Sequence, residues 1–170
     1  KFPYINHALH RDHRKIVVID GKVGYTGGMN IANYYIKGLP EIGDWRDMHV
    51  RIEGDAVNNL QDIFLTMWNK STKQHIGGAM YYPLLNDSIE TGGKTVAIVD
   101  RVPRKSPKIM RRMYVKSLDA AQHKVQIVNP YFTPTHSIKK AIRRALKRGV
   151  EVEIMIPGKS DIPFTPDAAF

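Results

Sequence analysis

Four β-branched residues in a row, Ile16-Val17-Val18-Ile19, place the strongest constraint on how this chain can fold. β-Branched side chains favour strands, and a run with no polar interruption predicts a strand, over residues 14–20, that is buried on both faces. Asp20-Gly21 follows at once and is a tight-turn signal, and residues 23–26 then have the pattern of a returning strand. The sequence therefore predicts a β-hairpin over residues 14–26.

Beyond the hairpin, the pattern alternates between strands and helices. Residues 48–53 alternate apolar and polar side chains, as in a half-buried strand, and Asp55 stands where it can cap a helix that runs to about Lys70. Residues 71–94 show no sustained period and predict a long loop. The remaining predicted elements are a strand at 95–99, a helix at 107–122, a strand at 125–128, a helix at 137–148 closed by Gly149, and a strand at 150–156. This order predicts the α/β class, with a mixed, largely parallel β-sheet flanked by helices.

Composition bounds the partners of the chain. Its 170 residues include 26 basic and 16 acidic side chains, a formal net charge of +10. Such a charge attracts phosphates, either those of nucleic acid or those of an anionic membrane, and charge alone does not separate the two. There is no cysteine, which excludes disulfides and thiolate metal sites, and no apolar run of the roughly 18 residues that a membrane span needs.

The residues with the clearest chemistry are His13 and Lys15, just before the β-branched run. Side chains alternate along a strand, so these two are predicted to project from the same face. A lysine can hold a phosphate oxygen while a neighbouring histidine attacks phosphorus or moves a proton. Asn30 follows the glycine pair Gly27-Gly28 and can donate to the same oxygens, and the glycines permit close backbone approach to a ligand.

Together with Asp20, these positions resemble the H-x-K-x(4)-D signature of the phospholipase D superfamily, with its downstream glycine pair and asparagine. The resemblance is to bacterial cardiolipin synthases in particular, and it covers nearly the whole chain, least of all residues 71–94. It includes residues 44–54, Asp-Trp-Arg-Asp-Met-His-Val-Arg-Ile-Glu-Gly, and residues 129–134, Asn-Pro-Tyr-Phe-Thr-Pro. It implies a phospholipase D-like fold, here incomplete.

The resemblance also implies a mechanism and roles. One motif histidine attacks a phosphodiester and forms a phosphohistidine, while the other protonates the departing alcohol and deprotonates the incoming one. For cardiolipin synthesis both alcohols come from phosphatidylglycerol, and no metal or other cofactor is required. His13 can be either histidine, and Lys15 and Asn30 would bind the phosphate oxygens. Asp20, counted with the catalytic motif, would orient the hairpin or basic neighbours rather than touch the substrate. Arg46 and Asp47 are expected to form a supporting ion pair near the site.

The chain shows one such motif, whereas enzymes of this type carry two. Because it lacks an initial methionine and stops within proline-rich sequence, we expect a piece of a longer protein. Residues 1–94 would be the C-terminal part of the first phospholipase D-like half, and 95–170 the start of the second half, packed with the first as one unit. The second motif would come from the missing C-terminal part or from a homodimer mate, and the piece alone would be soluble and inert.

Alternatives to the leading interpretation remain. A full-length phosphatidyltransferase would act at the bacterial cell membrane, on an anionic surface, whereas a phosphodiesterase of the same superfamily would cut nucleic acid, the less favoured partner. The basic side of the predicted helix at 137–148 is interpreted as a solvated face that would also suit an anionic bilayer. His49, on the polar face of its strand, is interpreted as structural.

Overall fold

The computed structural model describes residues 12–41, 43–83, 93–102, 106 and 108–158. The chain divides into two compact units, residues 1–98 and residues 99–170. Each unit is built around its own small β-sheet.

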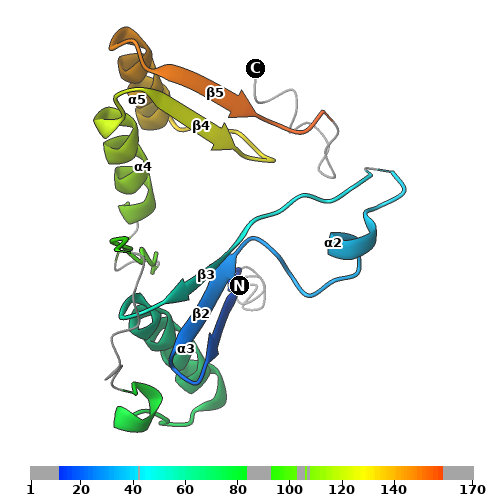
Figure 1. Cartoon of the computed structure of the whole chain (residues 1–170), viewed down its shortest axis with the longest axis vertical. Coiled ribbons are helices and arrows are strands. Elements are labelled where there is room, and N and C mark those ends of the chain that lie inside the picture. The colour runs from blue at the N-terminus through cyan, green and yellow to red at the C-terminus, as the bar shows by residue number, and fades with distance from the viewer. Residues whose placement is uncertain (1–11, 42, 84–92, 103–105, 107, 159–170) are drawn as a thin grey trace, which may run out of the picture. The chain divides into compact units, whose positions relative to one another are not determined.

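Three antiparallel strands, in the order β1-β2-β3, form the sheet of the first unit (Figure 1). They are β1 (Ile16–Ile19), β2 (Val23–Gly27) and β3 (His49–Glu53). Asp20 and Gly21 have φ of 54° and 63°, and the Lys22 amide donates to the Ile19 carbonyl at 3.0 Å. Positive φ at both central positions suits a tight hairpin turn, so the predicted β-hairpin is confirmed.

Helix α3 (Ala56–Thr72) packs on one face of this sheet and forms the core with it. Val57 and Leu60 are almost fully buried against Ile52 of β3. Leu60 approaches so closely that a Cβ at Gly24 would overlap its methyl group. Asp55 precedes the helix as predicted, but its side chain makes no capping hydrogen bond.

The opposite face of the same sheet, called the outer face below, is exposed in the part of the chain that the structure describes. Val17 and Ile19 point there and are 49% and 48% exposed, whereas Ile16 and Val18 pack on the core. The prediction of a strand buried on both faces is therefore wrong for the described residues. An apolar run fixes the strand, but only the elements packed on it decide how many of its faces are covered.

The segment between β2 and β3 contains a short helix, α2 (Tyr34–Lys37), and an isolated β-bridge between Leu39 and Gly43. After α3, the predicted loop is present apart from a turn of 3₁₀-helix, η1 (Ala79–Tyr81), and residues 84–92 of that loop lie outside the described part. The Tyr82 hydroxyl donates to the Asp62 carboxylate of α3, which raises the pKa of Tyr82 to about 12. This bond ties the end of η1 to α3.

The second unit is a strand-helix-strand motif preceded by a helix. Its elements are α4 (Ile109–Ala120), β4 (Lys124–Val128), α5 (His136–Lys147) and β5 (Glu151–Met155). The strands β4 and β5 pair in parallel, and α5 packs on both α4 and β5. Among the described residues of this unit, the buried apolar ones are Leu118, Ala141, Ala145 and Val150. Gly149 follows α5 with φ of 84°, as a helix-closing glycine should.

The α/β class is confirmed, but one largely parallel sheet is not what the described strands form. Both pairings in the first unit are antiparallel, and only β4 and β5 are parallel. The reason lies in the connections, because a tight turn can join only antiparallel neighbours, whereas a parallel pair needs a crossover such as α5. Residues 95–99, predicted as a strand, have no ladder partner among the described residues. Within the same residues, no helix is long and apolar enough to cross a membrane.

Candidate active site

His13 and Lys15 lie on the segment that leads into β1, which begins at Ile16. His13 is exposed and Lys15 is half-buried. The Lys15 ammonium donates to the backbone carbonyl of His13, with 2.6 Å between Nζ and the oxygen. Continuing the alternation of β1 backwards places both side chains on the outer face, with Val17, and away from α3. The structure thus places the ammonium at the backbone of the histidine that it is predicted to assist.

Asp12 and Arg14, which alternate with His13 and Lys15 along the chain, form an ion pair. Arg14 donates from Nε and from its terminal guanidinium nitrogen to the two Asp12 oxygens, both at 2.9 Å, and its amide also donates to Asp12 at 3.0 Å. The hydrogen bond from Arg14 holds the pKa of the Asp12 carboxyl below its usual range. Bidentate pairing of this kind orders both groups. Lys15 is therefore the cation of the motif that is not paired with a carboxylate among the described residues.

Gly27 and Gly28 do permit a close approach to the backbone, but the group that approaches is another segment of this chain and not a ligand. The Gly28 amide donates to the Met48 carbonyl at 3.0 Å. A Cβ on Gly27 would overlap that carbonyl and the His49 ring, and a Cβ on Gly28 would overlap the Asp47 carboxylate. The glycine pair lets the segment that leads into β3 lie against the end of β2. Its immediate role in this structure is thus in packing.

The side chain of Asn30 is hydrogen-bonded to Tyr35 of α2. Its side-chain amide donates to the Tyr35 hydroxyl at 3.2 Å, and that hydroxyl donates to the Gly28 carbonyl at 3.4 Å. These bonds tie α2 back to the end of β2. An amide nitrogen carries two hydrogens, so one of them is left for another acceptor. Asn30 and Lys15 are not joined by a direct contact among the described residues.

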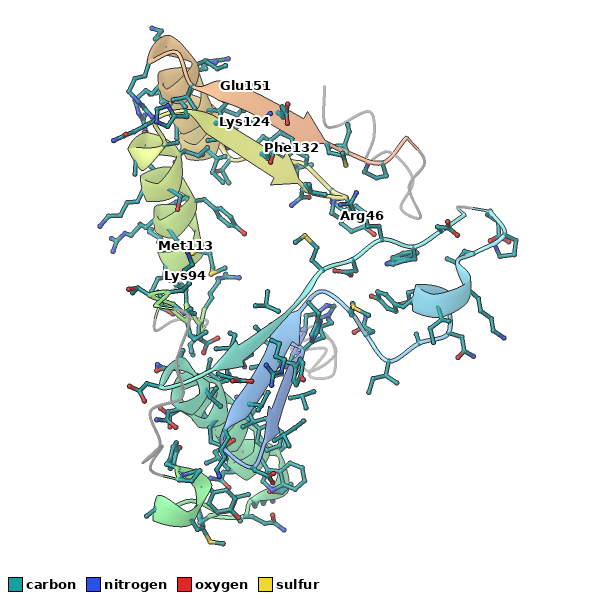
Figure 2. The ribbon with its side chains drawn as sticks, in the orientation of Figure 1. Arg46, Lys94, Met113, Lys124, Phe132 and Glu151 are labelled. Carbon is teal, nitrogen blue, oxygen red and sulfur yellow. The ribbon has the colours of Figure 1, made fainter. Side chains whose placement is uncertain are left out.

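Arg46 and Asp47 line an open groove of about 290 Å³ together with Met29, Tyr35, Asp44 and Trp45 (Figure 2 labels Arg46). The ion pair expected between them is not formed. Asp47 instead accepts from the Met48 amide at 2.7 Å, next to the glycine pair. Trp45 packs on the rings of Tyr34 and Tyr35, with centroids 4.8 and 5.9 Å away. Asp47 therefore holds the backbone at the entry to β3 and does not pair with Arg46.

Asp20 is not brought to His13 and Lys15, since the whole of β1 separates them. It occupies the exposed hairpin turn and lines a second groove, of about 490 Å³, with residues of α3 and η1. Neither groove includes His13 or Lys15 in its lining. A catalytic contact of Asp20 with substrate at the motif histidine is therefore not supported, whereas the expected orienting role in the hairpin is compatible with its position.

His49 is a residue whose position the sequence interpretation undervalued. It pairs with Gly27 in the ladder, on the outer face, and its Nδ1 is buried without a hydrogen-bond partner among the described residues. Extending the β1–β2 register by one residue sets Lys15 opposite Gly27, so Lys15, Gly27 and His49 fall in one row across three strands. Period-two alternation did predict the face of His49. Its place beside the motif needed the strand register.

No cluster of three or more His, Cys, Asp or Glu side chains that could hold a metal ion is present within the described ranges.

Comparison with known proteins places the chain in a family. Residues 114–169 match the family model described as cardiolipin synthase, PLD-like domain. The chain is 41% identical over 167 residues to a cardiolipin synthase of Staphylococcus aureus strain Mu50, which covers 96% of this chain. It is 39% identical over 168 residues to cardiolipin synthase 2 of Staphylococcus epidermidis, and 39% identical over 173 residues to cardiolipin synthase 1 of Staphylococcus aureus strain COL. The chain belongs to the phospholipase D superfamily, in its cardiolipin synthase-like branch.

The match with these relatives covers nearly all of this chain but only a small part of each relative. The chain spans about a third of the length of each of these cardiolipin synthases. The family model falls in the second unit, while His13 and Lys15 lie in the first. No solved structure is significantly similar to the chain. Family membership is thus established on sequence, and the assignment of residues 1–94 and 95–170 to two halves stays a prediction.

Proposed function

We propose that this chain supplies one half-site of a phosphatidyltransferase, which moves a phosphatidyl group between two phosphatidylglycerol molecules through a phosphohistidine. The observation that carries the proposal is the pair His13 and Lys15, in which the Lys15 ammonium bonds the His13 backbone carbonyl at 2.6 Å, in a chain 41% identical to a cardiolipin synthase over 96% of its length. Full-length protein would act at the bacterial cell membrane. The second half-site would come from chain beyond Phe170 or from a second copy.

The proposed reaction has two displacements at phosphorus. An imidazole nitrogen attacks the phosphorus of the first phosphatidylglycerol and forms a P–N bond, while the P–O bond to the terminal glycerol breaks and the second histidine protonates that oxygen. The hydroxyl of the second phosphatidylglycerol then attacks phosphorus, gives its proton to the second histidine and breaks the P–N bond. His13 is one of the two histidines. Splitting the transfer into two steps lets an alcohol replace water as acceptor.

Lys15 and Asn30 would stabilise the phosphate oxygens. Negative charge builds on these oxygens as phosphorus becomes five-coordinate, and donors placed beforehand stabilise that charge without rearrangement. The ammonium of Lys15 already lies at the His13 backbone. Asn30 gives one amide hydrogen to Tyr35 and has a second for a phosphate oxygen.

The test compares lipid and nucleic-acid turnover by the full-length protein. Purified protein would be incubated with phosphatidylglycerol vesicles, and cardiolipin and free glycerol would be measured by mass spectrometry. His13→Ala should abolish both products, while His75→Ala, an exposed histidine of the same unit outside the motif, should leave them unchanged. Cleavage of DNA without cardiolipin formation would overturn the proposal in favour of a phosphodiesterase.

A second arm uses the 170-residue chain alone. With one motif per chain, it should show negligible turnover, since two histidines are needed for the two proton and phosphoryl transfers. Sedimentation would establish whether the chain is a monomer under the assay conditions. Turnover by a monomer would contradict the half-site proposal.

A further inference from the structure

The two helices of the second unit hold nearly all the net charge of the chain. Counting one flanking residue at each end, α4 and α5 carry a single acidic residue, Asp119, against ten basic residues, and so a net charge of +9 out of the chain's +10. The basic residues, called the basic helix surface below, are Lys108, Arg111, Arg112, Lys116, Lys139, Lys140, Arg143, Arg144, Lys147 and Arg148.

Two of the ten hold the helices together. Arg144 donates twice to Asp119, at 2.9 and 2.8 Å, and this bond lowers the pKa of Asp119 and raises that of Arg144. Arg148 donates to the carbonyls of Leu118 and Ala121, at 2.8 and 3.2 Å, where α4 ends. Cations at a helix C-terminus also suit the helix dipole. These two arginines therefore have a structural use.

The other eight cations have no such use. All are exposed, and none forms an ion pair within the described part of the chain. The strands of the same unit behave differently, because Lys124 of β4 bonds Glu151 and Glu153 of β5 at 3.1 and 2.7 Å (Figure 2). The lysine on the strands is therefore paired with carboxylates, whereas these eight cations on the helices are not.

The cations of the two helices form one surface. At about 100° per residue, the five basic positions within α5 cover an arc centred opposite to that of Ala141 and Ala145, which are fully buried. On α4, Lys108, Arg112 and Lys116 share a side with Asp119 by the same geometry. Because Asp119 bonds Arg144 at one edge of the α5 arc, the two basic sides adjoin. Figure 2 shows nitrogen-tipped side chains gathered around α4 and α5.

We propose that the basic helix surface docks the protein on an anionic phospholipid bilayer. Eight uncompensated cations repel one another, and anionic headgroups would relieve this repulsion. Leu146, 53% exposed at the edge of the α5 cations, suits the boundary between headgroups and acyl chains. The choice of lipid over nucleic acid rests on the proposed function, since a phosphatidyltransferase must reach lipid in a membrane.

The experiment measures binding to vesicles and needs no turnover. The full chain would be cosedimented with vesicles of equal parts phosphatidylglycerol and phosphatidylcholine, and with vesicles of phosphatidylcholine alone. The helix variant is K139Q/K140Q/R143Q/K147Q. The matched control is K22Q/K37Q/K70Q/K73Q, four exposed lysines of the first unit, so both variants fall from +10 to +6. Circular dichroism would establish that both fold.

We expect the helix variant to lose about 100-fold or more in partitioning to the anionic vesicles, since each cation near such a surface contributes substantially. The control should lose less than tenfold, and neither should bind neutral vesicles. Equal losses in the two variants would mean attraction by overall charge only and would overturn the proposal. Loss of binding to a DNA duplex with unchanged vesicle binding would also overturn it, in favour of nucleic acid.

The two proposals fail separately. If the full-length protein makes no cardiolipin while vesicle binding still depends on α5, the phosphatidyltransferase proposal falls and the docking surface stands. If cardiolipin is made while the helix variant binds as the wild type does, the docking surface falls alone.

Discussion

The two units of the chain treat charge in opposite ways. The first unit has eleven basic and ten acidic residues, and the second has fifteen and six. In the first, single groups are placed individually, as Lys15 is on the His13 carbonyl and Arg14 on Asp12. In the second, eight cations of α4 and α5 form no ion pair within the described residues, and Asp119 pairs with Arg144 alone. The difference teaches that a site for bond-making needs few groups held in fixed positions, whereas attraction to a charged surface needs many that need no fixed partner.

The sharpest way to break this comparison is to remove His13. His13→Ala in the full-length protein should lower cardiolipin formation by roughly 10²–10⁴-fold or more, since it deletes a nucleophile or a general acid. Vesicle binding should not change, because the basic helix surface is intact. The α5 variant should show the reverse pattern when phosphatidylglycerol is supplied in detergent micelles. If both variants lose both properties, the division of labour between the units is wrong.

Removing core volume from the first unit should have the next largest effect. Leu60 is 2% exposed, and Leu60→Ala should lower the free energy of unfolding by about 2–5 kcal/mol, through lost burial and a cavity. Both tryptophans, Trp45 and Trp68, lie in this unit, so their fluorescence in urea reports its unfolding. Leu146→Ala, on the exposed side of α5, is the contrast. It should change the unfolding free energy measured by this fluorescence by less than about 0.5 kcal/mol. Equal effects would mean that the two units do not unfold independently.

A smaller effect is expected from crowding the glycine pair. Gly27→Ala would push a methyl group into the Met48 carbonyl and the His49 ring, which should cost about 1–3 kcal/mol of unfolding free energy. Gly77→Ala is the matched control, because its Cβ would meet no atom within 4 Å and its φ is not positive. Urea denaturation followed by tryptophan fluorescence measures both. An unchanged Gly27→Ala protein would refute the packing role assigned to this glycine.

The smallest expected effect is at Asp119, between the two basic helices. Its pKa is lowered in the folded state by Arg144, so its stabilising contribution is present above the unfolded-state pKa and is lost as the pH falls through the folded-state value. Asp119→Asn should therefore slightly lower the resistance of α4 and α5 to urea at pH 7. The difference from the wild type should vanish at strongly acidic pH. Far-UV circular dichroism measures it, and a difference that grows on acidification would contradict this sign.

Local sequence patterns predicted the elements better than their assembly. The turn at Asp20-Gly21, the end of α5 at Gly149 and the face of β3 that carries Ile52 all follow from residue types and their spacing. The strand at residues 95–99 was wrong, because apolar residues favour a strand only where a neighbouring strand can pair with it. The largely parallel sheet was wrong for a related reason, since strand direction depends on connections rather than composition.

The candidate site divides along the same line. The sequence predicts His13, Lys15, Asn30 and the glycine pair as site residues, because their chemistry and spacing are local. It did not predict that Asn30 bonds Tyr35, that Asp47 bonds the Met48 amide instead of Arg46, or that His49 lies over Gly27. The contact of His49 with Gly27 joins two strands, and the bonds of Asn30 and Asp47 depend on local backbone geometry that residue types alone do not fix.

By itself, the sequence determined which reactive and charged groups this protein carries and how they are spaced: a histidine and a lysine two residues apart, a glycine-containing hairpin and two helices dense in cations. The tertiary structure alone decided which groups are already engaged, with Arg144 and Arg148 bound between α4 and α5 while eight neighbouring cations remain exposed. The physical reason is range. Backbone propensity and side-chain charge are properties of single residues and near neighbours, whereas a hydrogen bond or a buried contact forms only once packing has brought distant segments within a few ångströms.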